Sequence, residues 1–296
     1  MSARLHIVNF LLRQIERRAL ARIQEPSKIR RRMELQTRLV FRAPRKTPIT
    51  REELTKGEAS VPALKIGDGT QGILLYFHGG AYIFGSANTH RRFVAKIAKD
   101  SELTAYSVNY RLAPEHPFPA AIDDALVAYQ ALLSQGIEAE QITIAGDSAG
   151  GGIALALLHA ILAQNLPHPR RVVAFSPLTD QSMQSASLLE NAHSEVMLPA
   201  ERMQEVRDMY LAEGFKNPLA SPLFGDFKNA PPVFLSVGTK EILRDDTLAM
   251  AAKLRAQNVA VTLDIGENTP HVWPFFHGRL PEADATLARL QTFLKT

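Results

Sequence analysis

Cysteine is absent from this chain of 296 residues. The chain can therefore form neither a disulfide framework nor a zinc site built on cysteine, and this suits a reducing compartment. It also has no apolar stretch approaching the roughly 20 residues that a helix needs to span a bilayer. The apolar run at residues 7–12 is interrupted by Asn9 and ended by Arg13, and no small-residue cleavage site follows it. The run is too short for a signal-peptide core, so we expect a cytoplasmic protein without stable membrane insertion.

The net charge of +4 hides an uneven distribution along the chain. Residues 1–56 contain 15 Lys and Arg against 5 Asp and Glu, a net of +10, so the other 240 residues carry −6. Such a basic arm can touch anionic lipid or nucleic acid. We favour an amphipathic helix that lies on another surface of the protein, because apolar residues recur at roughly helical spacing. These residues are Leu5, Val8, Leu11, Leu12, Ile15, Leu20 and Ile23. No aromatic residues are interleaved with the arginines to stack on bases, so we expect no nucleic acid partner.

After about residue 70, short β-rich runs alternate with longer helical ones. We expect strands over residues 73–77, 103–109, 141–145, 172–175, 233–237 and 260–263. We expect helices over residues 88–100, 120–135, 149–164, 245–257 and 282–294. Apolar strands that alternate with amphipathic helices predict an α/β fold with a mostly parallel central sheet covered on both faces. A ligand site is expected at the carboxyl ends of the strands.

Two segments break this alternation. Residues 1–45 are helical and basic, and residues 181–216 place a helix-like stretch, 200–211, between two expected strands. An insertion at that point lies above the strand ends, so both segments could cover the site. We therefore predict a catalytic core of residues 46–180 and 217–296, with residues 1–45 and 181–216 as cap segments.

A serine framed by glycines occurs in the segment 146–150, which reads Gly-Asp-Ser-Ala-Gly. This fits G-x-S-x-G, the nucleophile elbow, in which a tight turn between a strand and a helix exposes the serine. The expected strand 141–145 and helix 149–164 supply the required context. Ser148 is therefore the candidate nucleophile of an acyl-transfer reaction.

A second glycine motif, His-Gly-Gly-Ala at residues 78–81, directly follows the apolar run 73–77. Backbone amides fixed beside a nucleophile can stabilise the oxyanion of a tetrahedral intermediate. We predict that this oxyanion hole is formed by the amides of Gly79, Gly80 and Ala149. His78 precedes the hole, so we expect it to orient the loop by hydrogen bonding rather than to act as the base.

His271 is the candidate base, because it lies in a loop after strand 260–263 near the end of the chain, where the third triad member belongs. His277, before or at the start of the last helix, is the weaker alternative. The other histidines are interpreted as surface or packing residues; they are His6, His90, His116, His159, His168 and His193. They form no metal-spaced cluster with carboxylates, so we expect neither a metal nor a cofactor.

The acid that orients the base is expected in the loop after strand 233–237. Glu241 lies in this loop, whereas Asp245 and Asp246 are interpreted as residues that cap the following helix. We favour Glu241, and Asp245 stays open as the alternative. Either choice gives the chain order serine, acid, histidine that is typical of α/β-hydrolases.

With these residues placed, most of the chain from residue 70 onward resembles the hormone-sensitive-lipase family of bacterial α/β-hydrolase esterases, also called family IV. The matching segments are residues 78–80, 110–120 (Tyr-Arg-Leu-Ala-Pro-Glu-His-Pro-Phe-Pro-Ala), 146–151, the Glu241 loop and 270–273 (Pro-His-Val-Trp). The family usually has aspartate where Glu241 stands. It usually has a third glycine where Ala81 stands, and the resemblance implies that the hole is intact because its donors are the earlier amides.

The resemblance implies a serine carboxylesterase that hydrolyses short- to medium-chain acyl esters through Ser148, His271 and Glu241, with a helical cap over the site. Relatives of this kind often dimerise, which admits a homodimer. An amidase, lactonase or deacetylase on the same scaffold is the alternative, and a non-catalytic small-molecule receptor is disfavoured because the triad is complete. The candidates for the pocket lining are Tyr82, Phe84, Met197, Met209, Tyr210, Phe215 and Trp273.

Overall fold

The computed structural model describes residues 2–40 and 47–296, so the end of the predicted N-terminal cap segment, residues 41–45, lies outside the described residues. An eight-stranded sheet forms the centre, with strand order β1-β2-β4-β3-β5-β6-β7-β8. The strands are β1 (Ile49–Lys56), β2 (Ala59–Ile66), β3 (Ile73–Phe77), β4 (Thr104–Val108), β5 (Ile142–Asp147), β6 (Arg171–Phe175), β7 (Val233–Gly238) and β8 (Val261–Gly266). All six predicted strands are confirmed: strand 73–77 has the predicted ends, and the ends of the others differ by at most three residues.

In sheet order, the strands from β4 to β8 pair in parallel, whereas β2 pairs antiparallel with both β1 and β4. This first hairpin was not predicted from the sequence. In β1 only Leu54 is buried, so the strand lacks the apolar alternation that signals a half-buried strand. The two strands are joined across Gly57 and Glu58, and Gly57 has a φ of +61°, which suits a tight hairpin turn.

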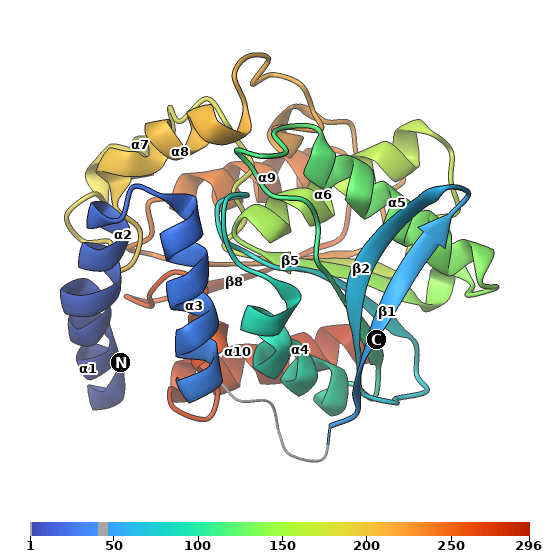
Figure 1. The fold of residues 1–296 in the computed structure, drawn as a ribbon, viewed down its shortest axis with the longest axis horizontal. Coiled ribbons are helices and arrows are strands. Elements are labelled where there is room, and N and C mark those ends of the chain that lie inside the picture. Colours follow the sequence, from blue (N-terminus) through green and yellow to red (C-terminus); the bar gives the residue numbers. More distant parts are fainter. Residues whose placement is uncertain (1, 41–46) are drawn as a thin grey trace.

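Five helices cover the two faces of the sheet (Figure 1). They are α4 (Ala87–Asp100), α5 (Ala120–Ser134), α6 (Ala149–Ala163), α9 (Arg244–Ala256) and α10 (Pro281–Lys295), and all five were predicted. In β3, Leu75 and Phe77 pack in one buried cluster with α5, α6 and α9, whereas Leu74 and Tyr76 pack in the other with α4 and α10. This alternation buries both faces of the strand, which explains its unbroken apolar sequence.

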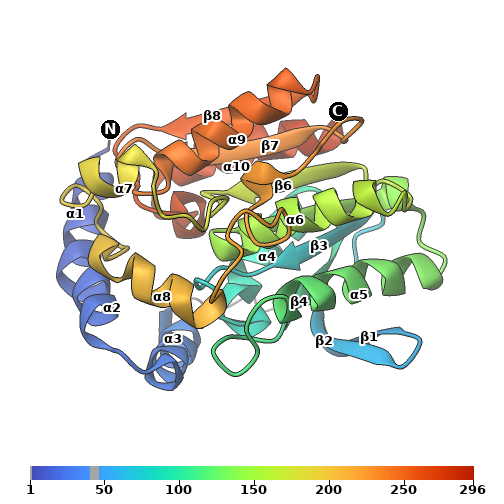
Figure 2. The same ribbon diagram turned by 90° about the horizontal axis from the view of Figure 1, so that it is seen from above.

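The remaining helices lie to one side of the sheet (Figures 1 and 2). The N-terminal ones are α1 (Ala3–Leu11), a π-helical turn (Leu12–Arg17), α2 (Arg18–Arg22) and α3 (Pro26–Val40). The second group, between β6 and β7, comprises α7 (Ala186–Glu190), a short 3₁₀ turn (Ala200–Arg202) and α8 (Met203–Tyr210). Arg202 joins the groups, because its guanidinium donates to the carbonyl oxygen of Leu20 at 2.8 Å. No helix in the described part of the chain is both long and apolar enough to cross a bilayer.

Candidate active site

Ser148 occupies a strained turn between β5 and α6, with φ +53° and ψ −121°. The glycines of the motif make this turn feasible. A side chain at Gly146 would collide with the carbonyl oxygen of Gly150, and one at Gly150 with that of Phe77. The Ser148 amide donates to the carbonyl oxygen of Phe175 on the neighbouring strand at 2.8 Å. The predicted strand–turn–helix context is therefore present.

His271 and Glu241 are in direct contact. Nδ1 of His271 lies 2.6 Å from Oε2 of Glu241, and both side chains are buried. The two residues come from the loops after β8 and β7. Nε2 of His271 is buried without a hydrogen-bond partner among the described residues, and the ring lines the same cavity as Ser148. Ser148 and His271 thus lie at one cavity, and Glu241 is bound to the other ring nitrogen of His271.

Two further residues, which were not predicted from the sequence, lie near this pair. Ser176, directly after β6, donates through Oγ to Oε1 of Glu241 at 2.8 Å and accepts from the amide of Val272 at 3.3 Å. The buried carboxylate of Glu195 accepts from the amide of Met197 at 2.8 Å. A serine at a strand end was a usable signal for Ser176, whereas nothing in the sequence connects Glu195 with the acid loop.

Two buried carboxylates act on the pKa of the His271 imidazole. Burial lowers the pKa of His271, but Glu241 and then Glu195 raise it by more, so the pKa lies above its ordinary value. Burial raises the pKa of Glu195, and the charge of Glu241 raises it further. The histidine is therefore a stronger base than a free imidazole.

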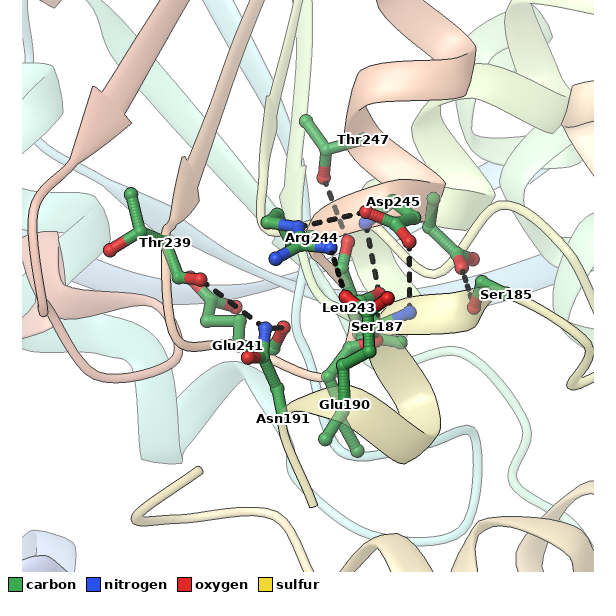
Figure 3. A network of polar contacts seen from close by, with 12 residues as sticks. Ser185, Ser187, Glu190, Asn191, Thr239, Glu241, Leu243, Arg244, Asp245 and Thr247 are labelled. Carbon is green, nitrogen blue, oxygen red and sulfur yellow. Dashed lines mark hydrogen bonds and ion pairs between the residues drawn. The ribbon is translucent and has the colours of Figure 1, made fainter. Parts of the chain in front are cut away.

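The carboxylate of Asp245 is held by Ser187 and Arg244 (Figure 3). Its Oδ2 accepts from the amide of Ser187 at 2.8 Å, and its Oδ1 pairs with Arg244 at 2.8 Å. The expectation that Asp245 and Asp246 cap α9 is wrong: the N-cap position is Leu243, without a side-chain cap. Asp246 instead accepts from the amides of Thr179 and Asp180, before α7, while Asp245 accepts from Ser187 within α7.

The loop that carries Glu241 is also held by the segment that follows α7. Asn191, after α7, donates its side-chain amide to the carbonyl oxygens of Glu241 at 2.8 Å and Thr239 at 3.2 Å (Figure 3). The inserted segment between β6 and β7 thus braces the loop that positions Glu241.

The free backbone amides near Ser148 are not the three that were predicted to form the oxyanion hole. The Gly79 amide is engaged, because it donates to Oδ1 of Asp147 at 3.0 Å. Among the described residues, the amides of Gly80, Ala81 and Ala149 have no hydrogen-bond partner. The three free donors next to Ser148 therefore include Ala81 in place of Gly79, and the alanine offers its amide as a glycine would.

Asp147 lies at the centre of a buried polar cluster beside the nucleophile. It accepts from the hydroxyl of Tyr76 at 2.6 Å, and its Oδ2 is 3.4 Å from Nε2 of His90. Burial opposes ionisation of Asp147, but His90 and Tyr76 outweigh it and lower its pKa. His90, interpreted from sequence as a surface or packing residue, in fact lines the cavity.

His78 lies under the glycine loop and not at the reaction centre. Its Nδ1–H donates to the carbonyl oxygen of Gly79 at 2.9 Å, and its ring stacks on Tyr110 at 4.2 Å. Burial, with the neighbouring His90, lowers the pKa of His78 to about 3. This neutral ring orients the loop, as predicted.

A cavity of about 330 Å³ adjoins Ser148 and His271. Its apolar lining comes from both irregular segments as well as the core, including Leu11, Met33 and Met203. Of the predicted lining residues, Phe84 and Met197 face the cavity. The others do not line it: Tyr82 stacks on Tyr210 at 3.7 Å, Trp273 donates to Thr286, and Met209 and Phe215 pack against the core.

Comparison with known proteins places the chain in a family. A family model described as alpha/beta hydrolase fold matches residues 74–275. An acetyl-hydrolase of Streptomyces hygroscopicus is 36% identical over 224 residues, 75% of each chain. An esterase of Acinetobacter venetianus is 36% identical over 223 residues, 75% of this chain and 74% of that protein.

The solved structures agree with this placement. An esterase from the bacterial hormone-sensitive lipase family superposes with a TM-score of 0.92 at 33% identity, over 100% of this chain and 98% of that chain. The chain therefore belongs to the α/β-hydrolase fold family, within the hormone-sensitive-lipase group of bacterial esterases.

Proposed function

We propose that the protein is a serine carboxylesterase that hydrolyses short- to medium-chain acyl esters through a Ser148–His271–Glu241 triad. The observation that carries this proposal is the 2.6 Å contact between His271 and Glu241 beside the cavity that exposes Ser148. A carboxylate on Nδ1 fixes the tautomer in which Nε2 can accept a proton. The order of the three residues along the chain is that of the family's fold.

The reaction follows from these positions. Ser148 Oγ attacks the ester carbonyl carbon while Nε2 of His271 takes the hydroxyl proton. The same nitrogen then protonates the leaving alcohol as the tetrahedral intermediate collapses to an acyl-enzyme. Water, deprotonated by His271, attacks the acyl carbon and releases the acid. Glu241 stabilises the imidazolium in both halves of the cycle.

The oxyanion hole is assigned to the amides of Gly80, Ala81 and Ala149, because these donors have no other partner among the described residues. Gly79 serves the hole indirectly, since its amide ties the loop to Asp147. Removal of one such donor typically costs about 2.7–4 kcal/mol of transition-state stabilisation.

The preference for short to medium acyl groups rests on the cavity and its cover. A volume of about 330 Å³ is at the small end of ligand pockets, which span roughly 300–1,000 Å³. The N-terminal segment and residues 181–216 are proposed to form the cap, because both contribute lining residues and Arg202 joins them. The acetyl-hydrolase among the relatives acts on a short acyl group by name, which supports the same preference.

A fluorophosphonate label and a panel of p-nitrophenyl esters test the proposal. We expect the label on wild type and not on Ser148→Ala, and faster hydrolysis of the butyrate than of the palmitate ester. Unchanged hydrolysis by Ser148→Ala would refute the triad, whereas no hydrolysis of any ester by wild type would leave a binding role. Faster cleavage of a matched amide or lactone would move the protein to one of the alternative hydrolase classes.

A further inference from the structure

The N-terminal helices expose large apolar side chains to solvent. Ile7 is 60% exposed, Phe10 62%, Leu11 47% and Ile15 56%. Figures 1 and 2 show α1 and α2 at the outer edge of the molecule. We call these four residues the apolar stripe. The helical spacing predicted one packing face that includes all of these positions except Ile7 and Phe10. Leu5 and Leu20 of that face are buried as expected, whereas Leu11 and Ile15 are exposed.

The stripe is not a random scatter of surface residues. The described residues include eight exposed large apolar side chains, and five of them lie between residues 2 and 40, the fifth being Leu35. The other three are isolated on separate elements: Leu189 on α7, Phe224 on a 3₁₀ turn and Ile265 on β8. Single exposed apolar residues are ordinary, whereas a contiguous set marks an interaction surface.

Positive charge surrounds the stripe. Arg4, Arg18 and Arg22 are exposed and form no ion pair with any residue that the structure describes. The only acid before residue 25 is Glu16, which is buried and bound by both terminal nitrogens of Arg32 at 2.8 Å. An exposed apolar stripe flanked by unpaired arginines is the pattern of a helix that lies in the interface of an anionic bilayer.

The stripe is continuous with the mouth of the cavity. Leu11 and Ile15 are exposed to solvent and also line the cavity that holds Ser148 and His271. The two residues therefore form part of its rim. Molecules dissolved in a surface that covers the stripe would therefore reach the rim of the cavity.

We propose that the apolar stripe, on α1 and the π-helical turn, docks the enzyme on an anionic lipid surface together with the arginines around it, with the cavity mouth turned toward the lipid. Esters dissolved in the lipid then enter past Leu11 and Ile15 without crossing bulk water. The docking itself does not depend on the triad, whereas the delivery of esters to Ser148 rests on the proposed function. The lipid is favoured over a second copy of the chain, because two such arginine-flanked faces would repel each other.

Sedimentation with vesicles tests the docking. The full-length protein is mixed with vesicles of phosphatidylcholine alone, or of phosphatidylcholine and phosphatidylglycerol in equal parts, at low and high salt. We expect binding to the anionic vesicles only, weakened by salt. Ser148→Ala should bind as wild type does, which separates failure of the docking from failure of the triad.

Two pairs of variants separate the apolar and the charged contributions. Ile7→Ser/Phe10→Ser should weaken binding about tenfold yet leave hydrolysis of a soluble ester unchanged, because neither residue lines the Ser148 cavity. Ile265→Ser, at 51% exposure on β8, is the matched control and should bind normally.

The triple variant Arg4→Glu/Arg18→Glu/Arg22→Glu tests the charged contribution. It should bind anionic vesicles more weakly, by about fivefold for each arginine. Its control has the same net charge and reverses three exposed arginines elsewhere, Arg51, Arg170 and Arg255.

The outcomes divide clearly. Loss of binding in both the apolar double variant and the triple arginine variant, with both controls intact, supports the proposal. No binding by wild type, or equal loss in the charge control, overturns it. A dimer that dissociates in Ile7→Ser/Phe10→Ser, seen by size-exclusion chromatography without vesicle binding, would assign the stripe to a second copy and would equally overturn it.

Discussion

The amide of Gly79 donates to the carboxylate of Asp147, the residue that directly precedes Ser148. This bond joins the two glycine motifs, which are almost seventy residues apart in the chain. The same carboxylate accepts from Tyr76 and lies against His90. The loop that carries the oxyanion donors is thus fixed relative to the nucleophile by one buried side chain.

Removal of this carboxylate should therefore slow catalysis without weakening substrate binding. In Asp147→Ala the Gly79 amide and the Tyr76 hydroxyl lose their buried partner, each at about 1–3 kcal/mol. We expect kcat to fall about 10- to 100-fold with little change in KM, and the rate of fluorophosphonate labelling to fall in parallel. Asp147→Asn keeps an acceptor of the same shape and should lose less. Equal kcat in wild type and Asp147→Ala would contradict the bracing role.

Glu241 and Asp245 make a matched pair for identifying the triad acid. Glu241→Gln removes the charge next to Nδ1 of His271, and we expect turnover to fall by about 10⁴-fold with the fold intact. Asp245→Asn keeps an acceptor for the Ser187 amide and should cost on the order of 1 kcal/mol of stability. Measurement of kcat and of the urea midpoint for both variants decides between them. The reverse pattern would show that the wrong carboxylate has been assigned.

The fold could be predicted where apolar periodicity is strong. Strand 73–77 and helix 149–164 are almost wholly buried, and their nearly unbroken apolar sequences indicate this burial. The β1–β2 hairpin could not be found this way, because its outer strand has a single buried side chain, Leu54. Its neighbours Glu52 and Glu53 are exposed and would suit a loop equally well.

The candidate site divides in the same manner. Ser148, His271 and Glu241 could be singled out because a local motif and chain order constrain them. Glu195 could not be singled out, because only the three-dimensional course of the inserted segment 181–216 brings it near Glu241. Ala81 was treated only as a replacement for the family's third glycine, and its amide was not counted as an oxyanion donor. The direction of that amide depends on the three-dimensional turn, which the sequence does not reveal.

The pH dependence of the enzyme should report the charges around His271. Only the neutral imidazole can accept the proton of Ser148, so kcat/KM falls as pH drops through the pKa of His271. Burial lowers this pKa but Glu241 and Glu195 raise it by more, so the acid limb should have its midpoint above 6.5. Glu195→Gln removes one of the raising charges and should move the midpoint to lower pH. Glu201→Gln, at an exposed site, is the control, and an unmoved limb in Glu195→Gln would contradict this reading of the charges.

Arg202 should be the contact that sets the position of the N-terminal helices over the cavity. Its guanidinium is buried, donates to the Leu20 carbonyl at 2.8 Å and pairs with Glu205 at 2.6 Å. Arg202→Ala leaves a buried carbonyl unpaired, so we expect a loss of about 1.5–3 kcal/mol in the free energy of unfolding.

The same change should loosen the cavity wall formed by Leu11, Leu20 and Met203. KM for the butyrate ester should therefore rise more than kcat falls, and the preference for butyrate over longer acyl esters should narrow. Arg17→Ala is the control: Arg17 joins the same two segments through an ion pair with the exposed Glu201 at 3.0 Å, and such pairs contribute only about 0–1 kcal/mol. If Arg17→Ala changed stability and chain-length preference as much as Arg202→Ala, the buried contact would not be what holds the helices in place.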